Sequence, residues 1–293
     1  MSNWKIVSRE NLDVKAWDLC VSESKNEHIY GYSWYLDTVA PKWVAFVYSE
    51  YLQVFPLPVK KKLTISYVFQ PEFHQRSSIF FRSNLQDESG LVDIISENIS
   101  KIDLTCDINL FNSDKVLKNV ILRYSNQESV INKNSQRNIK KAVKAGLKYC
   151  TASLNEVELA YQIFKKNTKY RLDENYKNNL LRLCSQLDKE NALVVRKIEN
   201  EDVVLGYVIL AKSKKRIVLL QLAISEDGKK TGASHYLVSK AINEFSSEAE
   251  LFDFEGSQNS GIARFYLSFG GEIEKYYHFH RNLSRGFIER LTS

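Results

Sequence analysis

Residues 216–245 read RIVLLQLAISEDGKKTGASHYLVSKAINEF, in which a strand-like apolar run is followed by a polar segment and an amphipathic stretch. In the amphipathic stretch, apolar residues recur at intervals of three and four, which places them on one face of a helix. This apolar face consists of Ala233, Leu237, Val238, Ala241, Ile242 and Phe245. The pattern therefore predicts a buried strand, a loop that contains glycine and a helix, a succession typical of α/β proteins.

The same succession of elements appears in both halves of the chain. Two helical patterns precede three strand-like runs, a further helical pattern and a fourth strand-like run. The strand-like runs are 43–48, 52–59, 64–69 and 108–111 in the first half and 192–198, 203–211, 216–223 and 251–254 in the second. We therefore expect an α/β (α+β) protein of two similar lobes, 1–125 and 126–293, each with a mixed, mostly antiparallel sheet flanked by helices.

The composition is that of a globular protein, with 44% hydrophobic and 26% charged residues in a chain of 293. No apolar run reaches the length of a membrane-spanning helix and the first residues contain no secretory signal, so we expect a cytoplasmic protein. The four cysteines form no CxxC pair and the histidines form no HExxH motif. We therefore expect neither a metal site nor a disulfide framework.

Positive charge is concentrated between residues 129 and 155, a stretch without any Asp or Glu in a chain of net charge +6. Its cations include Lys133, Arg137, Lys140, Lys141, Lys144 and Lys148. The apolar residues that recur there at helical spacing are Ile139, Ala142 and Val143. We expect an amphipathic connecting helix that ends at Gly146. Arg137 and Lys141, one turn apart, would then contact an anionic part of a substrate or belong to a solvated helix face.

The polar segment 225–234 is a candidate anion site because it joins a strand to the N-terminus of a helix. Free backbone N–H groups and the helix dipole attract phosphate at such a junction. Lys229 and Lys230 add mobile positive charge beside it. An ordinary helix start is the alternative interpretation.

Two carboxylates near the end of the chain are candidates for catalysis. Asp253 and Glu255 alternate with Phe252 and Phe254, so on a strand the two carboxylates would share one face. A carboxylate in that position orients an amine or accepts its proton. The alternative is that one of them caps the following helix or pairs with Arg264.

The residues Lys229-Lys230-Thr231-Gly232-Ala233-Ser234 resemble the loop Arg/Gln-x-x-Gly-x-Gly/Ala, with which GNAT acyltransferases hold the pyrophosphate of coenzyme A. Gly232 matches this loop, whereas Lys229 and Ser234 replace its first and last positions. Further segments are similar to the FemAB-like branch of the same superfamily, namely 34–37, 56–59, 70–75, 135–147 and 251–271.

The resemblance implies two GNAT-like lobes and the transfer of an acyl or aminoacyl group to an amine acceptor. The donor would be an acyl-CoA, an acyl carrier protein or an aminoacyl-tRNA, which makes tRNA a candidate partner, and no tightly bound cofactor is implied. The donor site implied by the loop comprises Lys229, Lys230, Gly232, Ala233 and Ser234. A catalytically degenerate GNAT-fold protein that binds RNA or another polyanion is the alternative.

Two further residues acquire candidate roles from the resemblance. Tyr266 lies in the last helix, where many GNAT enzymes use a tyrosine as general acid, and a tyrosine of the core is the alternative. Arg171 lies in the region that covers the acceptor site in GNAT folds. It would bind an acceptor carboxylate in bidentate fashion or serve as an ordinary cation near a helix C-terminus.

Overall fold

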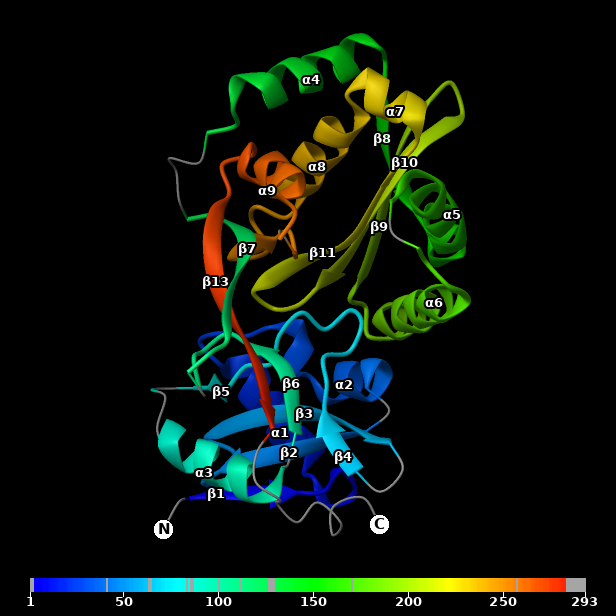
Figure 1. Ribbon diagram of the computed structural model, residues 1–293. Coiled ribbons are helices and arrows are strands. Elements are labelled where there is room, and N and C mark those ends of the chain that lie inside the picture. Colours follow the sequence, from blue (N-terminus) through cyan, green and yellow to red (C-terminus); the bar gives the residue numbers. More distant parts are fainter. Residues whose placement is uncertain are drawn as a thin grey trace. The chain divides into compact units, whose positions relative to one another are not determined.

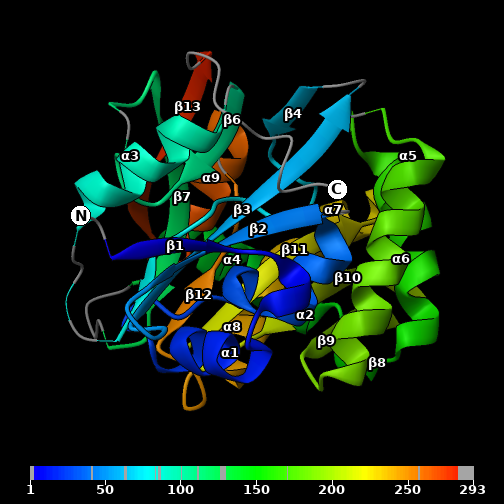
Figure 2. The ribbon, with the colours of Figure 1, turned by 90° about the horizontal axis from the view of Figure 1, so that it is seen from below.

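The structure is a computed structural model that describes residues 3–40, 42–62, 65–82, 84, 87–99, 101–110, 112–125, 130–169, 171–256 and 258–282. Thr64, Phe111 and Ser257, which belong to segments discussed above, lie outside the described residues. The chain divides into two compact units, one formed by Met1–Lys118 with Lys275–Ser293 and the other by Asn119–Glu274. Figures 1 and 2 together label the helices and strands of both units.

The first unit contains a sheet in the order β1-β2-β3-β4-β6-β13, with β5 beside β3. Its strands are β1 (Trp4–Val7), β2 (Lys42–Tyr48), β3 (Gln53–Lys62), β4 (Ile65–Val68), β5 (Phe80–Phe81), β6 (Lys101–Cys106) and the end of β13 (Glu272–Asn282). Its helices are α1 (Val14–Glu23), α2 (Ser33–Val39) and α3 (Glu88–Asn98), with the 3-10 turns η1 (Arg9–Asn11) and η2 (Ile29–Gly31). The pair β4–β6 is parallel, whereas β1–β2, β2–β3, β3–β4 and β6–β13 are antiparallel.

The second unit contains strands in the order β13-β7-β12-β11-β10-β9-β8. These strands are β7 (Lys115–Arg123), β8 (Lys148–Ala152), β9 (Leu193–Asn200), β10 (Val203–Lys212), β11 (Arg216–Ile224), β12 (Leu251–Asp253) and β13. The helices are α4 (Lys133–Lys144), α5 (Val157–Asn167), α6 (Glu174–Lys189), α7 (Glu226–Thr231), α8 (Ala233–Glu244) and α9 (Ser260–Leu267), with the 3-10 turn η3 (Leu154–Glu156). Figures 1 and 2 show α5 and α8 on opposite sides of β10 and β11.

The two units repeat one succession of elements, which confirms the fold class expected from the sequence. In each unit two helices precede three antiparallel strands, a helical connection and a strand that returns parallel to the third. The parallel pair is β4–β6 in the first unit and β11–β12 in the second. The connection includes α3 in the first unit and consists of α7 and α8 in the second, because a parallel crossover needs a connection long enough to reverse the chain twice.

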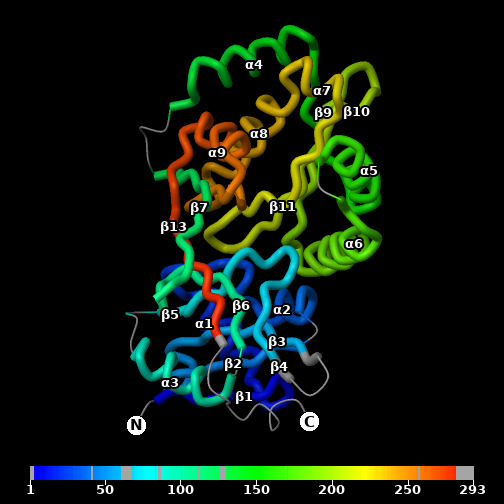
Figure 3. Tube along the Cα trace, in the orientation of Figure 1, coloured from blue at the N-terminus to red at the C-terminus, as the bar shows by residue number. Residues whose placement is uncertain are grey.

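The boundary of the units differs from the expected division between residues 125 and 126. The first unit ends within β7 and includes the chain again from within β13, and both strands are labelled in Figure 3. The physical reason is the pairing of β13 with β6, in which Tyr277–Asn282 runs antiparallel to Lys101–Cys106. The C-terminal strand therefore belongs to both units rather than to the second lobe alone.

Candidate active site

A pocket in the second unit opens where β11 and β12 separate. These two parallel strands pair only from Arg216 to Val218, after which β11 continues alone on that side. The remaining part of β11, together with α5, α8 and α9, lines a cavity of about 630 Å³. Its walls include Phe164, Gln221, Ser234, Glu255, Phe265 and Tyr266. The backbone edge that β12 leaves uncovered is therefore part of the pocket wall.

A β-bulge lies in the part of β11 that lines the pocket. Ile209 of β10 stands opposite Gln221, but the next residue, Leu210, stands opposite Leu219, so Leu220 is the additional residue. Bulges bend a strand and redirect its side chains, and they are frequent beside active sites. The side chain of Gln221 is only 3% exposed although it borders the pocket.

Glu255 enters the pocket from the end of β12. The backbone there leaves the strand conformation, with φ of +48° at Glu255 and +79° at Gly256. Left-handed backbone is unfavourable for a glutamate and is typical of sites where a side chain is held for function. The Glu255 Oε1 atom is closed to solvent and has no hydrogen-bond partner among the described residues. This burial raises the pKa of the Glu255 carboxyl to about 8.

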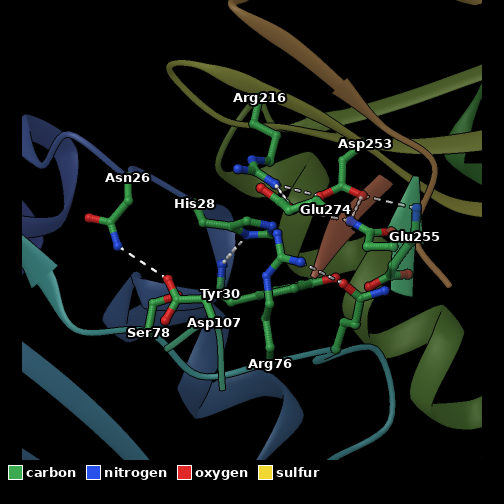
Figure 4. Close-up of polar contacts among 12 residues, drawn as sticks. Asn26, His28, Tyr30, Arg76, Ser78, Asp107, Arg216, Asp253, Glu255 and Glu274 are labelled. Atoms are coloured by element: carbon green, nitrogen blue, oxygen red, sulfur yellow. Dashed lines mark hydrogen bonds and ion pairs between the residues drawn. The ribbon is translucent and has the colours of Figure 1, made fainter. Parts of the chain in front are cut away.

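Asp253 is held in an ion-pair cluster instead of facing the pocket. Its carboxylate accepts hydrogen bonds from Arg216 Nη1 at 2.6 Å and from Asn119 Nδ2 at 2.8 Å. Arg216 also lies 3.6 Å from Glu274, so the cluster joins β7, β11, β12 and β13 (Figure 4). Both members of the Arg216–Asp253 pair are buried, and removal of one partner from such a pair typically costs about 3–5 kcal/mol.

The expectation that Asp253 and Glu255 share one face of a strand is therefore wrong. β12 ends at Asp253, and the left-handed conformation of Glu255 takes its side chain away from the strand alternation. The alternative in which one of the two carboxylates pairs with Arg264 does not hold for Asp253, which pairs with Arg216. Only Glu255 of the two carboxylates lines the pocket.

Tyr266 lies on α9, the helix that closes one side of the pocket. Its ring stacks on Phe254 with the centroids 4.8 Å apart, and its side chain is 7% exposed. Burial and then the charge of Glu255 raise the pKa of the Tyr266 hydroxyl, so it keeps its proton at neutral pH. Tyr266 is thus both part of the core and a residue of the pocket wall.

The segment expected to form a phosphate-binding loop is largely helical. Glu226–Thr231 forms the short helix α7, and the N–H of Gly232 donates to the carbonyl of Gly228. The carbonyl of Asn138 on α4 lies so close to Gly232 that a Cβ atom would not fit there. The prediction that the Gly232 amide binds a donor phosphate is therefore wrong, because this N–H is already used and α4 covers the glycine.

The other candidate residues of the segment 225–234 lie in different environments. Lys229 pairs with Glu226 at 2.6 Å and Lys230 with Asp227 at 3.1 Å, both on the surface of α7. Ala233 is buried in the core of the unit. Lys229 and Ser234 line the pocket, whereas Lys230 and Ala233 do not. The structure thus brings two of the five expected donor-site residues to the same cavity as Glu255 and Tyr266.

The expected substrate-binding cations lie outside the lining of this pocket. Arg137 and Lys141 are exposed on α4, and Arg171 is exposed in the connection between α5 and α6. α4 ends as expected, because Gly146 has φ of +72° and its N–H donates to the carbonyl of Val143. Val143 itself is 58% exposed, so it does not belong to the buried face on which we expected it.

Within the part of the chain that the structure describes, no three His, Cys, Asp or Glu side chains gather in a way that would hold a metal ion. In the same residues, no helix combines the length and the apolar character needed to cross a membrane.

Comparison with solved structures gives several proteins of the same fold along nearly the whole chain. FemX has a TM-score of 0.68 at 12% identity, covering 95% of this chain and 98% of FemX. The C-terminal domain (DUF2156) of a putative lysylphosphatidylglycerol synthetase from Agrobacterium fabrum has a TM-score of 0.59 at 10% identity, covering 92% and 91% of the two chains. A tandem GNAT protein from the clavulanic acid biosynthesis pathway has a TM-score of 0.56 at 8% identity, covering 97% and 99%.

No protein-family model and no curated protein matches the sequence. At these low identities, the structural similarity establishes the fold. The succession of elements in each unit and the separation of the parallel strands β11 and β12 agree with it. The chain therefore has the fold of FemX and of the tandem GNAT protein, the two-lobed fold that the sequence resemblance implied.

Proposed function

We propose that this protein is an N-acyltransferase that moves an acyl or aminoacyl group from a thioester or ester donor to an amine, with Glu255 as its general base. The supporting observation is the Glu255 carboxyl, which borders the pocket, has an oxygen without a partner among the described residues and has a pKa of about 8. A base with a pKa near the working pH accepts a proton efficiently. The GNAT fold of the chain agrees with acyl transfer.

In the proposed reaction the amine attacks the donor carbonyl directly. Glu255 accepts a proton from the amine as the C–N bond forms, and N–H groups on the uncovered edge of β11 polarise the carbonyl oxygen. The C–S or C–O bond to the leaving group then breaks. Tyr266, whose hydroxyl is protonated at neutral pH, donates a proton to the departing sulfur or oxygen. Glu255 returns its proton to solvent, and Tyr266 regains one.

The donor in this proposal is an acyl-CoA, an acyl carrier protein or an aminoacyl-tRNA. In this proposal Lys229 and Ser234, which line the pocket, contact the donor. The protein would act in the cytoplasm, where these donors are available, and would need no tightly bound cofactor. Most of the rate acceleration would come from positioning and carbonyl polarisation, since direct transfer forms no covalent enzyme intermediate.

The test is the change Glu255→Gln, which keeps the size of the side chain but cannot accept the proton. Transfer is measured with acyl-CoA and aminoacyl-tRNA donors against a panel of amines. We expect kcat to fall about 100-fold or more, and the wild-type rate to increase with pH up to about 8. The matched control is Glu190→Gln, at an exposed glutamate beyond the end of α6. Unchanged kcat in folded Glu255→Gln protein would rule out this role.

A further inference from the structure

Gln221 is a buried amide without hydrogen-bond partners. Its side chain is 3% exposed, and neither Nε2 nor Oε1 has a partner among the described residues. Buried polar groups in proteins are nearly always paired, and an unpaired one costs about 1–3 kcal/mol. A glutamine that leaves both its donor and its acceptor unpaired is therefore unfavourable for stability and requires an explanation from function.

The position of Gln221 indicates what would pair with it. The residue lies at the bulge of β11 and lines the pocket, and both atoms of its amide are closed to solvent there. The neighbouring walls include the aromatic rings of Phe164, Phe265 and Tyr266. Aromatic walls favour a flat, uncharged group that stacks on them.

Only some chemical groups satisfy both ends of a glutamine amide. A carboxylate accepts from Nε2 but offers nothing to Oε1, and an ammonium group does the reverse. A planar edge that carries a donor and an acceptor side by side satisfies both atoms at once. A carboxamide has such an edge, and so does adenine, which glutamine reads by two parallel hydrogen bonds in nucleic-acid recognition.

We infer that Gln221 is a recognition residue of the pocket, and that it binds a planar, uncharged donor–acceptor edge of the substrate, either a carboxamide or the edge of adenine. This inference rests on the proposed function at one point, because it assumes that the bound molecule is a substrate of the transfer. It assigns to β11 a specificity role separate from the proton transfer at Glu255.

The test uses two matched pairs of probes that differ only in this edge. In the first pair, alaninamide is compared with alanine methyl ester, which lacks the N–H donor. In the second pair, adenosine is compared with N6,N6-dimethyladenosine, which lacks the N–H donor of the adenine edge. Binding to the full-length protein is followed through the side-chain Nε2 resonance of ¹⁵N-labelled glutamine, assigned by its loss in Gln221→Leu. We expect one edge-bearing probe to shift this resonance and to bind about tenfold or more tightly than its partner.

In Gln221→Leu, that preference should disappear while the fold is retained, because the change replaces unpaired polar atoms with apolar ones of similar size. The pair that discriminates identifies the carboxamide or the adenine as the source. Equal binding within both pairs, or a preference that survives in Gln221→Leu, would overturn the inference and leave buried water as the partner of Gln221. This binding measurement needs no turnover. It therefore tests the inference separately from the proposed function, because Glu255→Gln should lose transfer and keep the probe preference.

Discussion

At the scale of single residues, the environment gives Asp253 and Glu255 opposite properties. Asp253 accepts hydrogen bonds from Arg216 and Asn119, which stabilise its charged form. Glu255 has no cation beside its buried oxygen among the described residues, and burial raises its pKa to about 8. One carboxylate therefore links β12 to β7 and β11, while the other remains available for proton transfer.

The raised pKa of Glu255 predicts a stability change in Glu255→Gln. The carboxyl has a pKa of about 8 in the folded protein and an ordinary value near 4.5 when unfolded. The stability associated with its protonated form is complete below pH 4.5 and is lost as pH rises to 8, because the unfolded chain ionises first. Gln does not ionise, so we expect the variant to be more stable at pH 8 by on the order of 2–4 kcal/mol.

Urea unfolding between pH 4 and pH 9 measures this difference. The two proteins should have similar stabilities near pH 4, diverge from pH 5 to pH 8, and keep a constant difference above pH 8. A difference independent of pH would mean that Glu255 is not a buried carboxyl of raised pKa. Greater stability combined with lower activity is the usual property of a strained catalytic residue.

At the scale of elements, two glycines end helices in the second unit under different constraints. Gly146 ends α4 with φ of +72°, and a Cβ atom there would meet nothing closer than 4.0 Å. Gly232 separates α7 from α8 with φ of +81°, and it lies directly against the carbonyl of Asn138 on α4. The first glycine is needed for its backbone conformation alone, and the second also for helix packing.

This difference predicts unequal costs for the same substitution. Gly146→Ala should destabilise the protein by about 1 kcal/mol, the cost of left-handed backbone for an alanine. Gly232→Ala has the same backbone cost and must also displace α4, so we expect a loss of about 3 kcal/mol or more. Chemical denaturation of both variants gives the comparison. Equal losses would show that α4 does not constrain Gly232.

At the scale of the whole molecule, the distribution of charge is uneven. The chain carries a net charge of +6, and the residues 129–155 contain no acid to balance their cations. On α4, Arg137, Lys140, Lys141 and Lys144 are all exposed, and no ion pair of theirs is present within the described part of the chain. A polyanion such as tRNA would release counterions on binding such a surface, which makes its affinity depend on salt.

The double change Arg137→Ala and Lys141→Ala tests whether this surface binds a polyanion. We expect an unchanged melting temperature, because both side chains are exposed, and weaker tRNA binding with a salt slope reduced by about 2. The control is Arg182→Ala with Lys189→Ala, which removes equal charge from exposed positions of α6. If both double variants lose the same affinity, net charge and not α4 explains the binding.

Much of the fold was predictable from local patterns. The helical spacing of Ala233, Leu237 and Ala241 predicted α8 to within a residue, and the glycine at 146 predicted the end of α4. These features depend on residues close together in the sequence, for which periodicity and capping preferences are sufficient. The repeated order of elements likewise predicted two similar α/β units.

The site depended on contacts that span large distances in the sequence. The sequence alone identified Glu255 and Tyr266 as candidates, but it assigned Asp253 the same role, because the partner of Asp253, Arg216, is supplied by another strand. A lone glutamine in the apolar run of β11 was the only sequence signal for Gln221. Its missing partners, the bulge and the separation of β11 from β12 are consequences of strand pairing. Sequence determined the elements and the candidate groups; tertiary structure decided which groups are neutralised and which face the pocket, because pairing and burial depend on residues far apart in the chain.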